Sequence, residues 1–124
     1  MEVIDTPQRT PKLGTLAQAA ALITDGSTLA FGGIHSHNGP MALIREIVRR
    51  GTKGLKLIAN VSAGMPADLL VGAGCVDTLT VCYVGLEHLG MAPRYRKAVE
   101  EKRIKVIDGD EIYFTEQPGL VGRT

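Results

Sequence analysis

Short apolar runs alternate with helix-type segments along this chain, and this alternation limits the folds that it can adopt. The runs typical of buried strands lie at 27–33, 55–60, 76–84 and 104–107. The segments between them begin near Pro40, Pro66 and Pro93, and proline favours the first turn of a helix. Strands joined through helices run parallel, with right-handed connections. The pattern therefore predicts an α/β fold with an open, mainly parallel sheet flanked by helices.

Local signals set several boundaries of this fold. Thr15 and Gln18 form a capping box ahead of an alanine-rich helix. A second helix carries its apolar residues on one face and ends at Gly51. The first fourteen residues are polar and contain two prolines. We therefore expect a loose lead-in over 1–14 and one domain over 15–124, a usual length for a domain.

Composition excludes several classes of function. The 124 residues include 14 basic and 13 acidic side chains, and there is no tryptophan, so neither a basic nucleic-acid surface nor a stacking platform is expected. No apolar run approaches the roughly 18 residues of a membrane span. The two cysteines, Cys75 and Cys82, lie in apolar surroundings and do not form a CxxC motif. We interpret them as reduced thiols of a cytoplasmic protein.

The site is expected where the strands end, because open parallel sheets bind ligands outside the carboxyl ends of their strands. Gly32 and Gly33 follow the first strand, and a glycine pair lets a ligand approach backbone N–H groups. The pair does not belong to a GxGxxG or P-loop motif, so a dinucleotide or nucleotide site is not predicted. A tight turn with no ligand is the alternative interpretation.

The polar residues at these strand ends leave their roles open. His35 and His37 are two residues apart, but without further ligands they predict polar loop residues facing a ligand and no metal site. Glu87 and Glu111 follow later strands and are candidate catalytic carboxylates, acting as base or nucleophile. Solvated loop acids are the alternative for both.

Three strings in order carry a resemblance to a known family. They are AAALITDGSTLAFGG, GPMALIREIVRRGTKGLKLIAN and DLLVGAGCVDTLTVCYVGLEHLGMAPRYRKAVEE, within residues 16–111. The chain resembles the A subunits of family I coenzyme A transferases, and in particular the glutaconate CoA-transferase A-subunit group. The resemblance implies a three-layer α/β fold. It also implies an acyl-CoA thioester and a carboxylic acid as substrates, and no bound cofactor.

The resemblance also implies a shared active site. In this family the glutamate that attacks the thioester belongs to the B subunit, and the A subunit supplies a glycine-rich wall around the acyl group. By motif, Gly32 and Gly33 match that wall, while Tyr83, Gly85 and Glu87 match a segment that faces the site. His35 is added as a substrate-binding candidate on the wall, and Glu111 matches an acidic position after the last strand. We therefore expect a hetero-oligomer with a B subunit.

The chain departs from the family at its end. Family A subunits continue after the acidic position, whereas this chain reaches Thr124 with a segment that does not follow the family. An incomplete domain is therefore expected. Two alternatives stay open: a non-catalytic module that binds coenzyme A or a partner, and an enzyme resembling phosphosugar isomerases.

Overall fold

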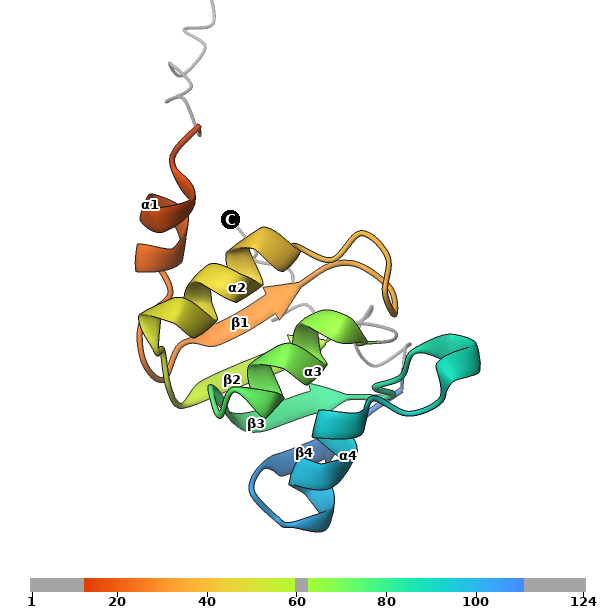
Figure 1. Ribbon diagram of the computed structural model, residues 1–124. Coiled ribbons are helices and arrows are strands. Elements are labelled where there is room, and N and C mark those ends of the chain that lie inside the picture. Colours follow the sequence, from red (N-terminus) through yellow and green to blue (C-terminus); the bar gives the residue numbers. More distant parts are fainter. Residues whose placement is uncertain (1–12, 60–62, 111–124) are drawn as a thin grey trace, which may run out of the picture.

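The computed structural model describes residues 13–59 and 63–110, and it confirms the predicted alternation of helices and strands (Figure 1). The elements in chain order are α1 (Leu16–Ala21), β1 (Thr28–Phe31), α2 (Met41–Arg50), β2 (Leu55–Ala59), α3 (Met65–Gly72), β3 (Val76–Val81), η1 (Glu87–Leu89), α4 (Pro93–Glu100) and β4 (Lys105–Asp108). The 3-10 turn η1, between β3 and α4, was not predicted.

The four strands form one parallel sheet in the order β1-β2-β3-β4. One register row runs Leu29, Leu57, Leu79, Val106 across the sheet. Because the strands follow one another in chain order, each connection turns the same way and places its helix on the same face. Figure 1 shows α2, α3 and α4 side by side on that face, with α1 beyond α2. The predicted α/β class is confirmed.

The core lies between the sheet and these helices. Leu57 and Leu79 of the central strands have no exposed surface, and neither do Ile44, Ile47 and Leu70 of the helices. Side chains alternate between the two faces of a strand. The next row, which contains Ala30, Ile58, Thr80 and Ile107, therefore faces away from these helices and is partly exposed. Among the described residues, helices cover one face, so two of the three expected layers are present.

The predicted capping box is confirmed at α1. The Gln18 N–H donates to Thr15 Oγ1 at 3.2 Å, and the Thr15 N–H donates to Gln18 Oε1 at 2.8 Å. The expected strand over 76–84 was too long at its end, because β3 stops at Val81. Beyond it, Val84 makes only an isolated bridge to Ala63.

Three helices end in the same way at the amino edge of the sheet, the edge at which the strands begin. Residue 51 after α2, residue 74 after α3 and residue 102 after α4 all have a positive φ, between 54° and 70°. At α4 the Arg103 N–H donates to the Ala98 carbonyl at 2.8 Å, and α3 has the equivalent bond from Cys75 to Leu70. These are Schellman endings, in which glycine is preferred. Gly51 and Gly74 fit that preference, whereas α4 uses Lys102.

Lys53 connects three turns at the amino edge. Its N–H donates to Asp25 Oδ1 at 2.8 Å. Its ammonium donates to the carbonyls of Ala73 and Gly74, each at 3.3 Å, and so neutralises the negative end of α3. Nearby Cys75 is fully buried, and burial raises the pKa of its thiol, although the charge of Lys53 opposes the shift. Cys82 is half-buried, and neither cysteine forms a disulfide.

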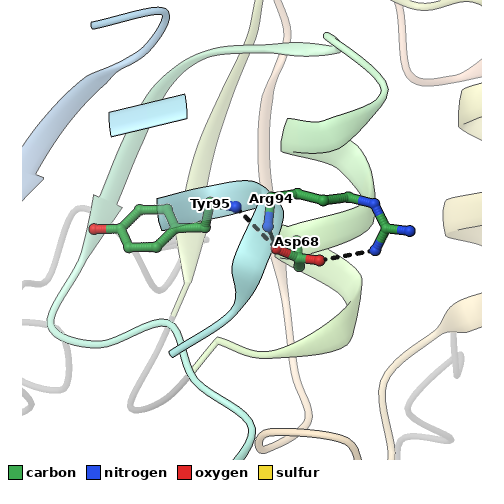
Figure 2. A network of polar contacts seen from close by, with 3 residues as sticks. All are labelled: Asp68, Arg94 and Tyr95. Atoms are coloured by element: carbon green, nitrogen blue, oxygen red, sulfur yellow. Dashed lines mark hydrogen bonds and ion pairs between the residues drawn. The ribbon is translucent and has the colours of Figure 1, made fainter. Parts of the chain in front are cut away.

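Asp68 joins α3 to α4 through a buried carboxylate (Figure 2). Its Oδ1 accepts the N–H groups of Arg94 and Tyr95, at 2.8 and 2.9 Å, and its Oδ2 accepts the Arg94 guanidinium at 3.0 Å. The residue that precedes α4, Ala92, offers no capping side chain, so a neighbouring helix supplies the cap. Asp68 thereby fixes where α4 begins.

Within the described residues, no helix is both long and apolar enough to span a membrane.

Candidate functional site

The connection from β1 to α2 folds into a tight turn at the carboxyl edge of the sheet, the edge at which the strands end. Ile34 and His37 exchange two backbone hydrogen bonds, of 3.0 and 2.7 Å. His35 lies within this turn with φ of 49°, in the left-handed region that non-glycine residues rarely adopt. The turn brings the His35 side chain toward the connection that follows β3.

The connection from β2 to α3 packs against this turn, backbone on backbone. The Met65 N–H donates to the His35 carbonyl at 3.0 Å. A β-carbon on Gly64 would overlap that same carbonyl oxygen, so only glycine fits there. Ala63 in turn exchanges hydrogen bonds with Tyr83 and Gly85, at 3.0 and 2.9 Å. The three connections therefore form one continuous surface.

A glycine-lined pocket lies at the junction of the first two connections. Gly33 has φ of 107°, and a β-carbon there would lie 2.9 Å from the Gly39 backbone. Gly32 differs, because it has an ordinary backbone conformation and nothing within 4 Å of where a β-carbon would lie. The pocket is lined by Phe31, Gly32, Gly33, Ile34, His35, His37, Ala59, Ala63, Gly64 and Pro66.

The pocket holds about 10 Å³, which is room for one water molecule or one oxygen atom. Among the residues that the structure describes, no carboxylate lines it. A wider depression beside α1 is lined by Gly14, Gln18, Ala19, Ala21 and Leu22, none of which is titratable or nucleophilic. The predicted site residues that the structure describes lie at the carboxyl edge, so this edge is the candidate functional site.

His35 connects the pocket to the segment after β3. Its Nδ1 lies 3.3 Å from the Gly85 carbonyl oxygen, and its Nε2 lies 3.8 Å from Glu87 Oε1. Its ring meets the Tyr83 ring edge-on, with centroids 6.2 Å apart. Glu87 also has a positive φ, of 55°. The carboxylate of Glu87 is therefore held by an ion pair when the imidazole is protonated.

Most of the predicted site residues come together in this arrangement. Gly32, Gly33 and His35 line the pocket, and Tyr83, Gly85 and Glu87 lie against His35. Glu111 lies outside the described residues, so its role stays a prediction. No group of three or more histidine, cysteine or acidic residues able to hold a metal ion occurs in residues 13–59 and 63–110.

Sequence reasoning missed the roles of Gly64 and Asp68. Gly64 lies between a strand and the proline that opens α3, which is the same local pattern as Gly33, and that similarity could have marked it. Asp68 offered no signal, because its partners are 26 and 27 residues away in the sequence. Tyr95 of α4 lies near Asp108, the last residue of β4. Burial and the charge of the Asp108 carboxylate both raise the pKa of the Tyr95 hydroxyl.

Fold and site together define a class: α/β proteins with a parallel sheet whose carboxyl-edge loops enclose a glycine-lined pocket. Within that class the chain belongs to the Coenzyme A transferase family, whose model matches residues 14–113. It is similar to the A subunits of family I of these enzymes.

Two relatives support this assignment by sequence. The chain is 37% identical to the A subunit of 3-oxoadipate CoA-transferase from Pseudomonas knackmussii over 101 residues, which are 81% of this chain and 35% of that protein. It is 38% identical over 86 residues to an uncharacterised protein of Archaeoglobus fulgidus, covering 68% of this chain and 19% of that one.

Two solved structures support it by shape. Glutaconate coenzyme A-transferase of Acidaminococcus fermentans superposes with a TM-score of 0.76 at 29% identity, over 82% of this chain and 32% of that one. A variant of the decarboxylase AibA/AibB superposes with a TM-score of 0.73 at 31% identity, over 78% and 38%. The chain thus spans about a third of the 3-oxoadipate relative and of both solved chains, and less of the archaeal protein.

Proposed function

We propose that this chain is the A-type part of an acyl-CoA:carboxylate CoA-transferase and contributes the glycine-rich wall of an active site shared with a B subunit. The substrates are an acyl-CoA thioester and a free acid, of the short dicarboxylic or oxo-acid class. The partner supplies the glutamate that attacks the thioester. Membership of the family and the likeness to the 3-oxoadipate CoA-transferase chain of Pseudomonas knackmussii support this proposal.

One observation carries the proposal. The pocket has room for an oxygen atom, and no carboxylate of the described residues lines it, while Glu87 Oε1 lies 3.8 Å from His35 Nε2. A carboxylate that attacks a thioester needs an unpaired oxygen and donors directed at the developing oxyanion. No carboxylate of the described residues lines the pocket to meet the first requirement, which favours a nucleophile from another chain.

The proposed chemistry is balanced without a cofactor. The partner's glutamate attacks the thioester carbonyl, the carbon–sulfur bond breaks, and an acyl-glutamyl anhydride and CoA thiolate form. The thiolate then attacks the glutamyl carbonyl, which releases the first acid and leaves a glutamyl-CoA thioester. The second acid takes the CoA by the same steps in reverse. In this scheme Gly32 and Gly33 bound the space in which the acyl oxygen lies.

The test is a CoA-transfer assay with acyl-CoA thioesters and free acids, run with and without a B subunit of the family. We expect CoA transfer only when both subunits are present. Mass spectrometry should then detect a CoA adduct on the partner. A CoA adduct on an acid of the purified chain contradicts the proposal. Gly32→Ala should fold normally, since its β-carbon meets nothing, yet lower turnover of the pair at least about tenfold.

A non-catalytic module that binds CoA or a partner is the second candidate, because no carboxylate of the described residues lines the glycine-lined pocket. In that case the chain binds CoA or a B subunit in a titration, and no pair turns over. Isomerisation of a sugar phosphate by the chain alone would instead support an enzyme resembling phosphosugar isomerases.

A further inference from the structure

His35 contacts all three of the connections that form the candidate site. It belongs to the β1–α2 turn, its carbonyl accepts the Met65 N–H of the β2–α3 connection at 3.0 Å, and its ring reaches Gly85 after β3. The His35 side chain is 18% exposed, against 44% for Glu87. One half-buried residue therefore links segments that lie up to 52 positions apart in the sequence.

The backbone conformations on both sides of this link are unfavourable ones. His35 and Glu87 have φ of 49° and 55°, in a region where the β-carbon crowds the backbone. Such conformations persist where the surrounding structure imposes them, and they cluster at functional sites. Here the two strained residues face each other, with His35 Nε2 and Glu87 Oε1 3.8 Å apart.

The partners of the imidazole favour a proton on Nδ1. A carbonyl oxygen only accepts, so the 3.3 Å contact between Nδ1 and the Gly85 oxygen is a hydrogen bond when Nδ1 carries the hydrogen. Nε2 faces a carboxylate oxygen, which also only accepts while it is ionised. The contact of 3.8 Å is longer than a hydrogen bond, so it acts as an ion pair when Nε2 also carries a proton.

We infer that His35 is a positioning residue, which holds Glu87 and Tyr83 at the rim of the glycine-lined pocket. Its carbonyl holds the β1–α2 turn against the β2–α3 connection, and its ring links that turn to the segment after β3. When Nε2 is protonated, its ring pairs with the Glu87 carboxylate, and in either state it meets the Tyr83 ring edge-on. That Glu87 thereby helps to select the acyl group is the part of the inference that rests on the proposed function.

The first test reads the ring directly and needs neither CoA nor a partner. In ¹⁵N-resolved NMR spectra of the chain, His35 should show the neutral tautomer with the proton on Nδ1. His88, exposed and adjacent to Glu87 in sequence, should show the more usual proton on Nε2. Glu87→Gln should shift the ring signals of His35 and leave those of His88 in place. The inference is wrong if neutral His35 carries its proton on Nε2. It is also wrong if the ring signals of His35 do not change in Glu87→Gln.

The second test measures the consequence in the assembled pair. His35→Gln should raise KM for the acyl-CoA about tenfold or more with a smaller change in kcat, and Glu87→Gln on top of it should add little. His88→Gln is the matched control and should leave both constants within about twofold. If the effects of His35→Gln and Glu87→Gln on KM are fully additive, the two residues act independently, and the inference that His35 acts through Glu87 is wrong.

These outcomes separate the two claims. If no pair transfers CoA while the NMR result holds, the proposed function fails and the positioning role stands. If transfer occurs while the ring spectrum is ordinary, the positioning role fails alone. Should His35→Gln not fold, the spectra of the unaltered chain and of Glu87→Gln still decide.

Discussion

The chain reverses direction at both edges of the sheet, but different residue types take the left-handed backbone positions at the two edges. At the amino edge the left-handed positions are Gly26, Gly51, Gly54 and Gly74, with Lys102 as the exception. At the carboxyl edge, left-handed positions are also taken by His35, Asn38 and Glu87. A turn that only ends a helix needs no side chain, so glycine is the least costly residue. Where a side chain at the turn has a role, a non-glycine residue stays at that position despite its backbone strain.

The largest expected effect tests whether the carboxyl edge depends on close backbone contact. Gly64→Ala should lower the free energy of unfolding by about 3 kcal/mol, because its β-carbon overlaps the backbone carbonyl of His35, which cannot rotate away. Urea unfolding measures it. Gly32→Ala, on the same edge with open space around it, is the control and should stay within about 0.5 kcal/mol. Equal effects of the two would show that this edge is as tolerant as a simple loop.

The next effect concerns the carboxylate that fixes the start of α4 beside the same edge. Asp68→Ala should cost about 2 kcal/mol, because it leaves the N–H groups of Arg94 and Tyr95 without their acceptor. Urea unfolding again measures the change. Asp77→Ala removes an exposed acid from β3 and should change stability little. A cost for Asp68→Ala no greater than that of Asp77→Ala would contradict the capping role.

The exception at the amino edge offers a gain in stability. Lys102→Gly should raise the free energy of unfolding by about 1 kcal/mol, because glycine adopts the φ of 54° without strain. Gly51→Ala, at the equivalent position after α2, should lower it by about the same amount. Thermal unfolding of the two variants measures both changes: stability should rise in Lys102→Gly and fall in Gly51→Ala.

The same exchange at the carboxyl edge sharpens the comparison. Glu87→Gly relieves an equal backbone strain but removes the partner of His35, so its net gain should be smaller than that of Lys102→Gly. If Glu87→Gly stabilises the chain as much as Lys102→Gly does, the Glu87 side chain contributes nothing to the folded state.

The smallest effect is a pH dependence at the amino edge. Because burial raises the pKa of the Cys75 thiol, the folded chain keeps a proton there that the unfolded chain loses above about pH 8.5. Stability should therefore decline as the pH rises from about 8.5 toward 10. Urea unfolding at several pH values should show this decline in the unaltered chain and in Cys82→Ala. The decline should be weaker in Cys75→Ala, and an unchanged slope there would assign it to another group.

The fold could be predicted from the sequence because its signals are local. The capping box of Thr15, the prolines near the helix starts and the apolar runs each act within a few residues. Given alternating strands and helices, crossover connections then predict a parallel sheet. The order of its strands, β1-β2-β3-β4, came only from the structure. Where the local signal was ambiguous the prediction was less accurate, as at 82–84, whose β-type residues lie beyond the end of β3.

The sequence by itself therefore determined the α-helices and strands, their succession along the chain and the edge that carries Gly32, Gly33 and His35. Only the tertiary structure decided which of those residues meet. The pairing of His35 with Glu87, the fit of Gly64 under the His35 carbonyl and the cap that Asp68 gives to α4 join residues 26 to 52 positions apart. Such contacts depend on how strands and helices pack in three dimensions, and no periodicity or spacing in a single chain encodes them.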